Sequence, residues 1–362
     1  MNYELTDQYW IWLSAAVRLT PRQFYALIAA AGSARGVWDD PRVGKDILDE
    51  KAYAALVAAR NERVFFRVFA LLDKSGIRAV TRESDLYPTR LTSIADAPPT
   101  LFVKGDPDLN APKPFAIVGT RNASHEGRKT TAEFAQALAK EGVCVVSGLA
   151  RGIDTCAHMS CLAAGGRTIA VLGGGVNYVT PIENERLARE IIESGGSLVS
   201  EMRPEDAPQK WSFPARNRII SGLSAGVLVV EGRRTSGALI TADYAIDQSR
   251  DVFAVPGSIY APMSEGTNFL IQCGAYPALS PWDILEGERW GCRPNSAMKE
   301  KPLPEMSDDE KKIYEKVALE PSTFDEIANS TGYSAQALNS HLTMMILRGI
   351  IVKTPGNVYR KN

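Results

Sequence analysis

Long hydrophobic runs are absent from this sequence of 362 residues. Because a membrane-spanning helix needs roughly 20 mostly apolar residues, neither such a helix nor a membrane partner is expected. The first ten residues include Glu4 and Asp7 and lack the pattern of a secretory signal peptide, so the expected compartment is the cytoplasm. The length suits roughly two or three domains, and a hydrophobic content of 45% is enough to form their cores.

Cysteine is also scarce. The five cysteines form no Cys-x-x-Cys pair and are odd in number, which argues against a disulfide framework. Cys156, His158 and Cys161 are close in sequence, but on a helix each residue is turned by about 100° from the one before it. Their side chains would therefore point in different directions, and no metal site is predicted.

An excess of positive charge is missing as well. Lysine and arginine total 41, against 42 aspartates and glutamates, so the formal net charge is −1. This balance argues against a generally basic, histone-like binder of nucleic acid. Any affinity for nucleic acid must come from a local group of cations, from backbone amides or from base stacking.

Familiar catalytic and nucleotide-binding motifs are absent or occur out of context. Neither G-x-G-x-x-G after the first apolar strand nor a Walker A loop is present, so a dinucleotide site and an ATPase are disfavoured and no cofactor is expected. The stretch Gly222–Gly226 matches G-x-S-x-G, but its serine precedes the predicted strand Val227–Val230 instead of following one. A serine hydrolase is therefore disfavoured.

Residues 1–79 and 306–362 are predicted to form two small domains. In the first, apolar residues recur at helical spacing, and Thr20-Pro21 begins a helix, so we expect a small helical domain, SAM-like or helix-hairpin-helix-like. Such modules contact DNA in some proteins, whereas a purely packing role is equally compatible with the pattern. In the second, three helical patterns and a hairpin predict a winged helix. A proline-rich linker, 291–305, precedes it.

The region from residue 80 to 290 alternates apolar, β-rich segments with helical ones. This alternation predicts an α/β fold with a doubly wound, Rossmann-like parallel sheet. The predicted strands are Phe115–Val118, Val143–Val146, Thr168–Leu172, Leu198–Val199, Val227–Val230 and Val252–Val255.

Glycine-rich loops follow the first three of these strands: Gly119–Ser124, Ser147–Asp154 and Gly173–Gly175. In a doubly wound sheet, ligands bind beyond the carboxyl ends of the strands, where helix N-termini offer free N–H groups to anions. Two of the loops carry an arginine, and Phe213–Ile220 adds two more. The predicted DNA-binding residues are Gly119, Thr120, Arg121, Asn122, Ser147, Gly148, Arg151, Gly152, Gly174, Arg216, Asn217 and Arg218.

In these segments the sequence resembles the DNA-processing protein A family, also called DprA or Smf. The residues that carry the resemblance are Ala116–Arg121, Ser147–Asp154 with Ala157-His158, Phe213–Ile220, Ser236–Ala242, and Val255–Gly257 with Gly266–Asn268. The resemblance implies a homodimer that binds single-stranded DNA during natural transformation, protects it and helps to load RecA. It implies no catalytic activity, and it assigns DNA contact to Arg121.

This sequence departs from the family pattern at one loop. Where relatives often carry a basic residue, it has Ile182 and Glu183, and Thr180 replaces a common aromatic residue. A strong contribution of this loop to DNA binding is therefore not expected.

Two alternatives remain open. The first is a nucleotide-processing enzyme of the nucleoside monophosphate phosphoribohydrolase type, with Glu201 and Glu231 at strand ends, although its Pro-Gly-Gly-x-Gly-Thr loop is missing. The second is a transcription factor that reads duplex DNA with the winged helix. Its expected recognition helix, residues 334–343, contains Gln336, Asn339 and His341 but no lysine or arginine, so a protein contact or weak DNA contact is favoured.

Overall fold

A computed structural model describes residues 3–286, 306–354 and 357–361. The chain divides into two compact units, Met1–Cys292 and Arg293–Asn362. Among the described residues, no helix has both the length and the apolar character that crossing a bilayer requires. The predicted linker, 291–305, lies outside the described residues.

The first unit is built on a sheet whose nine described strands run in the order β1-β2-β6-β5-β4-β3-β7-β8-β9. From β6 to β9 all neighbours are parallel, whereas β2 pairs antiparallel with both β6 and β1. The strands are β1 (Arg78–Thr81), β2 (Thr100–Gly105), β3 (Pro114–Val118), β4 (Cys144–Ser147), β5 (Thr168–Val171), β6 (Ser197–Ser200), β7 (Gly226–Val229), β8 (Asp251–Ala254) and β9 (Tyr276–Pro277).

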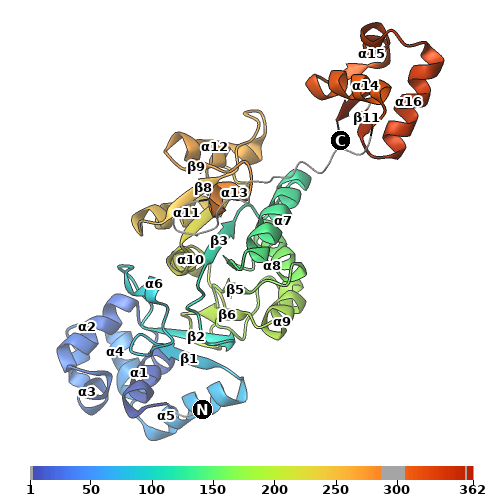
Figure 1. Ribbon diagram of the computed structural model, residues 1–362. Helices are drawn as coiled ribbons and strands as arrows, with labels where there is room; N and C mark the ends of the chain where they lie inside the picture. Colours follow the sequence, from blue (N-terminus) through green and yellow to red (C-terminus); the bar gives the residue numbers. More distant parts are fainter. Residues whose placement is uncertain (1–2, 287–305, 355–356, 362) are drawn as a thin grey trace. The chain divides into compact units, whose positions relative to one another are not determined.

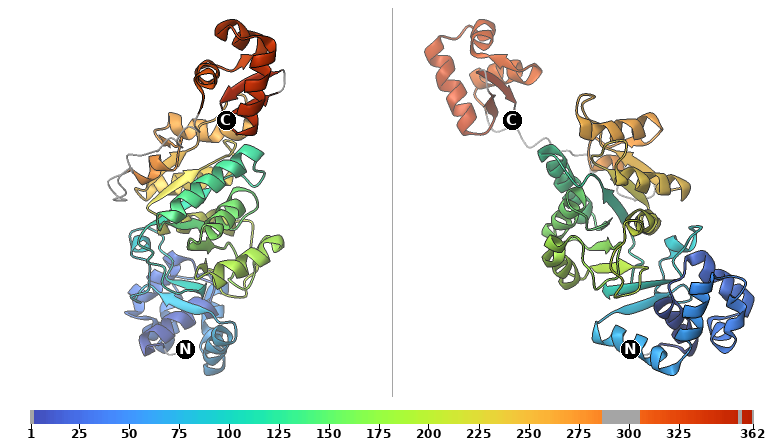
Figure 2. Two further views of the ribbon diagram at one scale, coloured as in Figure 1. Left: turned by 45° about the vertical axis from the view of Figure 1, so that its right-hand side comes forward. Right: turned by 180° about the vertical axis from the view of Figure 1, so that it is seen from behind.

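Helices cover both faces of this sheet, which confirms the predicted doubly wound fold (Figures 1 and 2). Side chains alternate along β3: Phe115 and Ile117 face one layer of helices, and Ala116 and Val118 face the other. One layer contains α7 (His125–Lys140), α8 (Ile153–Ala163), α9 (Glu185–Glu193) and α13 (Trp282–Leu285). The other contains α6 (Thr89–Thr92), α10 (Ser212–Leu223), α11 (Gly237–Asp247) and α12 (Glu265–Gln272).

Strands β1 and β2 were not predicted from the sequence, because they precede the alternation of apolar strands and helices from which the sheet was predicted. They extend the sheet with an antiparallel edge on which the N-terminal helices pack (Figure 2). The indole of Trp10 donates a hydrogen bond of 2.7 Å to the carbonyl of Pro99, and Ser14 lies 2.8 Å from the hydroxyl of Thr100. The boundary proposed at residues 79 and 80 falls inside β1, within one compact unit.

The N-terminal segment is helical, as expected. Its helices are α1 (Leu5–Ala16), α2 (Pro21–Ala31), α3 (Ala34–Asp39), α4 (Glu50–Ala59) and α5 (Glu62–Lys74), with the short 3-10 helix η1 (Pro41–Gly44). Thr20 and Gln23 form a capping box that begins α2. The aromatic rings of Trp12, Phe24 and Trp38 fill the core between these helices.

The second unit has the elements of a winged helix. Its helices are α14 (Asp308–Leu319), α15 (Phe324–Thr331) and α16 (Ala335–Leu347). Its strands, β10 (Ser322–Thr323), β11 (Ile351–Thr354) and β12 (Val358–Lys361), pair in the order β10-β12-β11. The exposed residues of α16 include Gln336, Asn339 and Met344 but no charged side chain.

His158 is a fully buried histidine on the inner face of α8. Its Nδ1 lies 2.7 Å from the hydroxyl of Thr168, which itself donates to the carbonyl of Val145. The Thr168 oxygen therefore accepts from Nδ1–H, while Nε2 has no hydrogen-bond partner among the described residues. Burial, together with the nearby charge of Arg216, lowers the pKa of His158 to about 3.

This depressed pKa predicts a loss of stability in acid. In the unfolded chain His158 binds a proton near pH 6.5, whereas in the folded chain it stays neutral until the pH approaches 3. Its contribution to the free energy of unfolding is therefore complete above pH 6.5 and declines as the pH falls toward 3. Between pH 7 and pH 5, His158→Gln should lose about 2 kcal/mol less stability than the wild type does. Urea unfolding at both pH values measures this difference, and equal losses would contradict the assignment.

Candidate nucleic-acid interface

The strand order reverses at β3, which has β4 on one side and β7 on the other. Such a switch point opens a crevice beyond the carboxyl ends of the two strands that diverge there. A cavity of about 740 Å³ lies at this position. It is lined by the end of β3 and the β3–α7 loop, by the β7–α11 loop, and by α10 and α11, mostly in their N-terminal halves. Ala150, Asp154, Lys210 and Met263 complete the wall.

Two helices begin at the wall of this cavity. Phe213 and Pro214 are in the first turn of α10, and Gly237 and Ala238 are in the first turn of α11. The first N–H groups of a helix lack intrahelical partners and carry the positive end of the helix dipole. Both helices therefore favour an anion in the cavity.

The charged side chains of the cavity are mostly basic. Arg121, Lys210, Arg216 and Arg233 line it, and Asp154 is the single carboxylate among its lining residues. Arg121, Lys210 and Arg233 are exposed and can reach a ligand. The guanidinium of Arg121 lies 5.6 Å from the centre of the Phe213 ring. A cation and an aromatic face are thus adjacent, which suits a ligand with both phosphates and bases.

Arg216 differs from the other cations because it is buried, with an exposed fraction of 6%. Its Nη1 donates to the carbonyl of Gly148 at 2.7 Å and to that of Val171, and its Nε donates to Asn217 at 3.0 Å. Burial lowers the pKa of Arg216 to about 10, so the group stays charged at neutral pH. Arg216 therefore ties the ends of β4 and β5 to α10 beneath the cavity.

Asp154 lies in the same buried layer. Burial raises its pKa, and the charge of Arg216 and two backbone N–H groups oppose that rise. These N–H groups belong to Gly148 and Ala150, at 3.2 and 3.4 Å from Oδ2. The carboxylate therefore braces the β4–α8 loop from below.

Half of the residues predicted to bind DNA line the cavity: Gly119, Thr120, Arg121, Asn122, Arg216 and Asn217. The others, Ser147, Gly148, Arg151, Gly152, Gly174 and Arg218, do not. Two glycines of this second group, Gly148 and Gly152, serve close packing. A Cβ at Gly148 would lie 2.3 Å from the guanidinium of Arg216, and Gly152, at a φ of 81°, packs against the carbonyl of Thr120.

The loop Gly173–Gly175, predicted to cradle a phosphate, is buried under the segment that follows β6. A Cβ at Gly174 would lie 2.9 Å from the ring of Pro208, and one at Gly175 would lie 2.1 Å from the carbonyl of Arg203. These glycines permit close approach of protein, not of a ligand. A glycine-rich turn after a strand allows close approach either of a phosphate or of another protein segment, so the sequence pattern does not distinguish the two.

Arg151 and Glu183 form an exposed ion pair. Glu183 belongs to the 3-10 helix η2 (Ile182–Asn184), in the loop where the family often has a basic residue. The pair is solvated on both sides, with side-chain exposures of 64% and 57%, so it contributes little to stability. It leaves the Arg151 charge partly neutralised.

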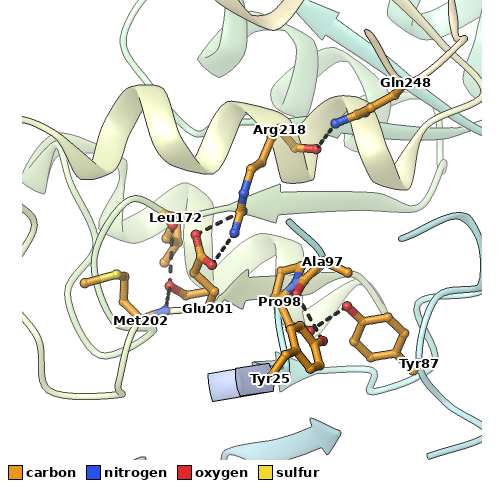
Figure 3. A network of polar contacts seen from close by, with 10 residues as sticks. Tyr25, Tyr87, Ala97, Pro98, Leu172, Glu201, Met202, Arg218 and Gln248 are labelled. Carbon is orange, nitrogen blue, oxygen red and sulfur yellow. Dashed lines mark hydrogen bonds and ion pairs between the residues drawn. The ribbon is translucent and has the colours of Figure 1, made fainter. Parts of the chain in front are cut away.

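Arg218 does not line the cavity. It pairs instead with Glu201, a contact that Figure 3 shows. Its two terminal nitrogens donate to the two carboxylate oxygens at 3.0 and 2.6 Å, and both side chains are nearly buried. Gln248 donates to the Arg218 carbonyl at 2.9 Å. Tyr25 and Tyr87 donate to neighbouring backbone carbonyls in the same network. Arg218 thus holds α10 to the end of β6.

Several cavity residues were missing from the predicted set, among them Lys210, Phe213, Arg233, Thr235 and Ser236. Phe213 and Ser236 are within segments that carry the family resemblance, and Lys210 and Arg233 each lie three residues before one of them. The topology would have selected the Arg233–Ser236 loop, because it follows β7, the strand beyond the switch point.

Comparison with known proteins decides the family. The family model described as DNA recombination-mediator protein A matches residues 78–288, more than half of the chain, and that of the DprA winged helix domain matches residues 297–357. The chain belongs to the DprA family.

Curated relatives agree with this assignment. Protein Smf of Escherichia coli is 39% identical over 80% of this chain and 79% of its own length. The DNA processing protein DprA of Bacillus subtilis is 46% identical over 61% of this chain and 74% of its own length.

Two solved DprA structures share the fold. The Streptococcus pneumoniae protein superposes with a TM-score of 0.64 at 36% identity, covering 79% of this chain and 98% of that one. The Helicobacter pylori protein, whose structure concerns its single-stranded DNA binding mode, has a TM-score of 0.53 at 29% identity. That match covers 58% of this chain and 94% of the other.

No cluster of three or more metal-ligating side chains occurs in the part of the chain that the structure describes. His158 and Cys161 are buried, and the thiol of Cys161 donates to the carbonyl of Arg167. Ser224, the serine of the G-x-S-x-G stretch, is buried and donates to the carbonyl of Ile220. None of His158, Cys161 and Ser224 lines the cavity.

The Arg218–Glu201 ion pair should contribute to the stability of the fold. Arg218→Met leaves the nearly buried carboxylate of Glu201 without its partner, which should lower the free energy of unfolding by about 3 kcal/mol. The double variant Arg218→Met/Glu201→Leu should recover most of this loss, since no unpaired charge remains. Chemical denaturation of both variants measures the effect. A single variant as stable as the wild type would show that the pair is not structural.

Proposed function

We propose that this DprA-family protein binds single-stranded DNA in the cavity at the β3–β7 switch point. One observation carries the proposal: the exposed Arg121 lies beside the Phe213 ring in a cavity whose other exposed charged residues, Lys210 and Arg233, are also basic. The single-stranded DNA binding mode of the Helicobacter pylori relative supports the choice of ligand.

Each part of the cavity has a role in this mechanism. The basic side chains and the N-termini of α10 and α11 bind phosphates, and the Phe213 ring supplies a face on which an unpaired base can stack. Phosphate contacts and stacking carry little sequence information. Binding is therefore nearly independent of sequence, and it favours single strands because duplex bases are already stacked on one another.

The modest charge of the chain limits the number of ionic contacts that one molecule makes. With a net charge of −1, binding rests on the few basic residues of the cavity. A homodimer places two such cavities on one strand and doubles these contacts. We extend the proposal to a cytoplasmic homodimer that protects incoming DNA during natural transformation and helps to load RecA, in line with the recombination-mediator family.

A catalytic role is disfavoured because each carboxylate near the strand ends is already bound to another group of the protein. Glu231 accepts hydrogen bonds from the backbone N–H and the hydroxyl of Ser124, at 2.9 and 2.5 Å, and so holds the N-terminus of α7. Glu201 pairs with Arg218, and Asp154 is bound to backbone N–H groups. Each carboxylate thus has a structural partner, and we propose a binding protein without hydrolase activity.

Arg121→Ala tests this site. Removing one charge-assisted hydrogen bond to a phosphate should weaken binding of single-stranded DNA about ten- to a hundredfold. The slope of log affinity against log salt should shrink by about 0.7 for each phosphate that is no longer neutralised. Fluorescence anisotropy with a labelled oligothymidylate at several salt concentrations measures both quantities, and a duplex of equal length should bind more weakly than the single strand.

Arg186→Ala is the matched control, because it removes one exposed arginine from α9, outside the cavity. It should leave affinity and salt slope close to those of the wild type. An Arg121→Ala protein with wild-type affinity, or a wild type that prefers the duplex, would refute the proposal.

A further inference from the structure

Residues 201–211, here called the covering segment, connect the end of β6 to the start of α10. The segment ends at the cavity, since Lys210 and the following Phe213 both line it. One end is held by the Glu201–Arg218 pair. At the other end, the hydroxyl of Ser212 accepts from the N–H of Gln209 and donates to its carbonyl. Because Lys210 belongs to the covering segment and Phe213 follows it at the start of α10, the position of the segment affects where both side chains lie.

The middle of the covering segment is fixed by backbone contacts to the loop after β5. Gly175 donates its N–H to the carbonyl of Asp206 at 2.8 Å, and Asn177 donates to that of Pro204 at 3.2 Å. These bonds hold the segment on its sheet side. Its opposite side faces the N-terminal helices α1 and α5.

Apolar packing between the covering segment and those helices is incomplete. A cavity of about 330 Å³ lies there, lined by Ala15, Val68, Leu71 and Leu72 of the helices and by residues 203–206 of the segment. Because a cavity lacks the dispersion contacts of a packed core, hydrophobic contact alone holds this side weakly. An additional interaction must therefore hold the covering segment against the N-terminal helices.

That interaction is an ion triad centred on Asp206, whose side chain is 9% exposed. Arg203 donates to its two oxygens at 3.1 and 2.8 Å, and Arg18, which follows α1, donates to Oδ1 at 2.9 Å. Burial by itself raises the pKa of Asp206, but hydrogen bonds from Arg203 and Arg18 outweigh it and lower the pKa below its usual value. The carboxylate is therefore charged and doubly bound.

We propose that Asp206 is a positioning residue for DNA binding, through which the N-terminal helices set the position of Lys210 and Phe213. Arg18 belongs to the helical domain, and Asp206 lies in the middle of the covering segment. Their contact therefore makes the position of the covering segment depend on the position of the helical domain. Neither side chain lines the DNA cavity. The inference rests on the proposed function of that cavity and assigns a task to the helical domain.

Arg18→Ala in the full chain is the test, because the Arg18 side chain is 53% exposed and its removal leaves the core intact. Releasing the segment should weaken binding of oligothymidylate about three- to tenfold. The salt slope should stay at the wild-type value, since every cation that lines the cavity is still present. Hydrogen exchange at the amides of Gly175 and Asp206 should become faster. Arg18→Lys, which retains a cation, should recover part of the affinity.

Arg35→Ala is the control, because it removes an exposed arginine of the same domain that pairs with Asp39 at 3.7 Å. It should change neither affinity nor exchange. Wild-type affinity in Arg18→Ala, a reduced salt slope, or an equal loss in Arg35→Ala would overturn the inference. Arg121→Ala, measured in parallel, separates the two claims: if it weakens binding and Arg18→Ala does not, only the positioning role fails.

Discussion

The buried guanidinium of Arg216 is the interaction on which the proposed DNA site depends. It joins the carbonyl of Gly148 after β4 and that of Val171 in β5 to the first turns of α10. A guanidinium taken out of water must have its donors satisfied, so the loops around it have little freedom to move. The floor of the cavity is thereby fixed before a ligand arrives, which reduces the entropy lost on binding.

The arginines of this region divide into two groups by burial. Arg216 and Arg218 are buried and organise the protein, whereas Arg121 and Arg233 are exposed in the cavity and available to a ligand. The N–H groups that Arg216 donates to Gly148 and Val171, and those that Arg218 donates to Glu201, are not available to DNA. In the proposed mechanism, a chain with a net charge of −1 can bind a polyanion because few cations suffice where helix N-termini and an aromatic ring assist them.

The parallel sheet could be predicted from the sequence because its apolar strands alternate with amphipathic helices over a long stretch. The first loop, Gly119–Asn122, could be predicted as well, since it follows the first strand of the parallel sheet. The sequence could not show that Gly174 and Arg218 lie outside the cavity. Gly174 is buried by the covering segment and Arg218 pairs with Glu201, and both are contacts between residues far apart in the sequence. Lys210 and Arg233 were missing from the predicted residues, since their placement at the cavity depends on the order of the strands.

The central claim is that single-stranded DNA occupies the cavity at the switch point between β3 and β7. A crystal structure of the protein with a short oligothymidylate tests it most directly. The account predicts a phosphate within hydrogen-bond distance of Arg121, near the N-terminus of α11, with a base against Phe213. DNA bound elsewhere, on the winged helix or the N-terminal helices, with no nucleotide in this cavity, would contradict it.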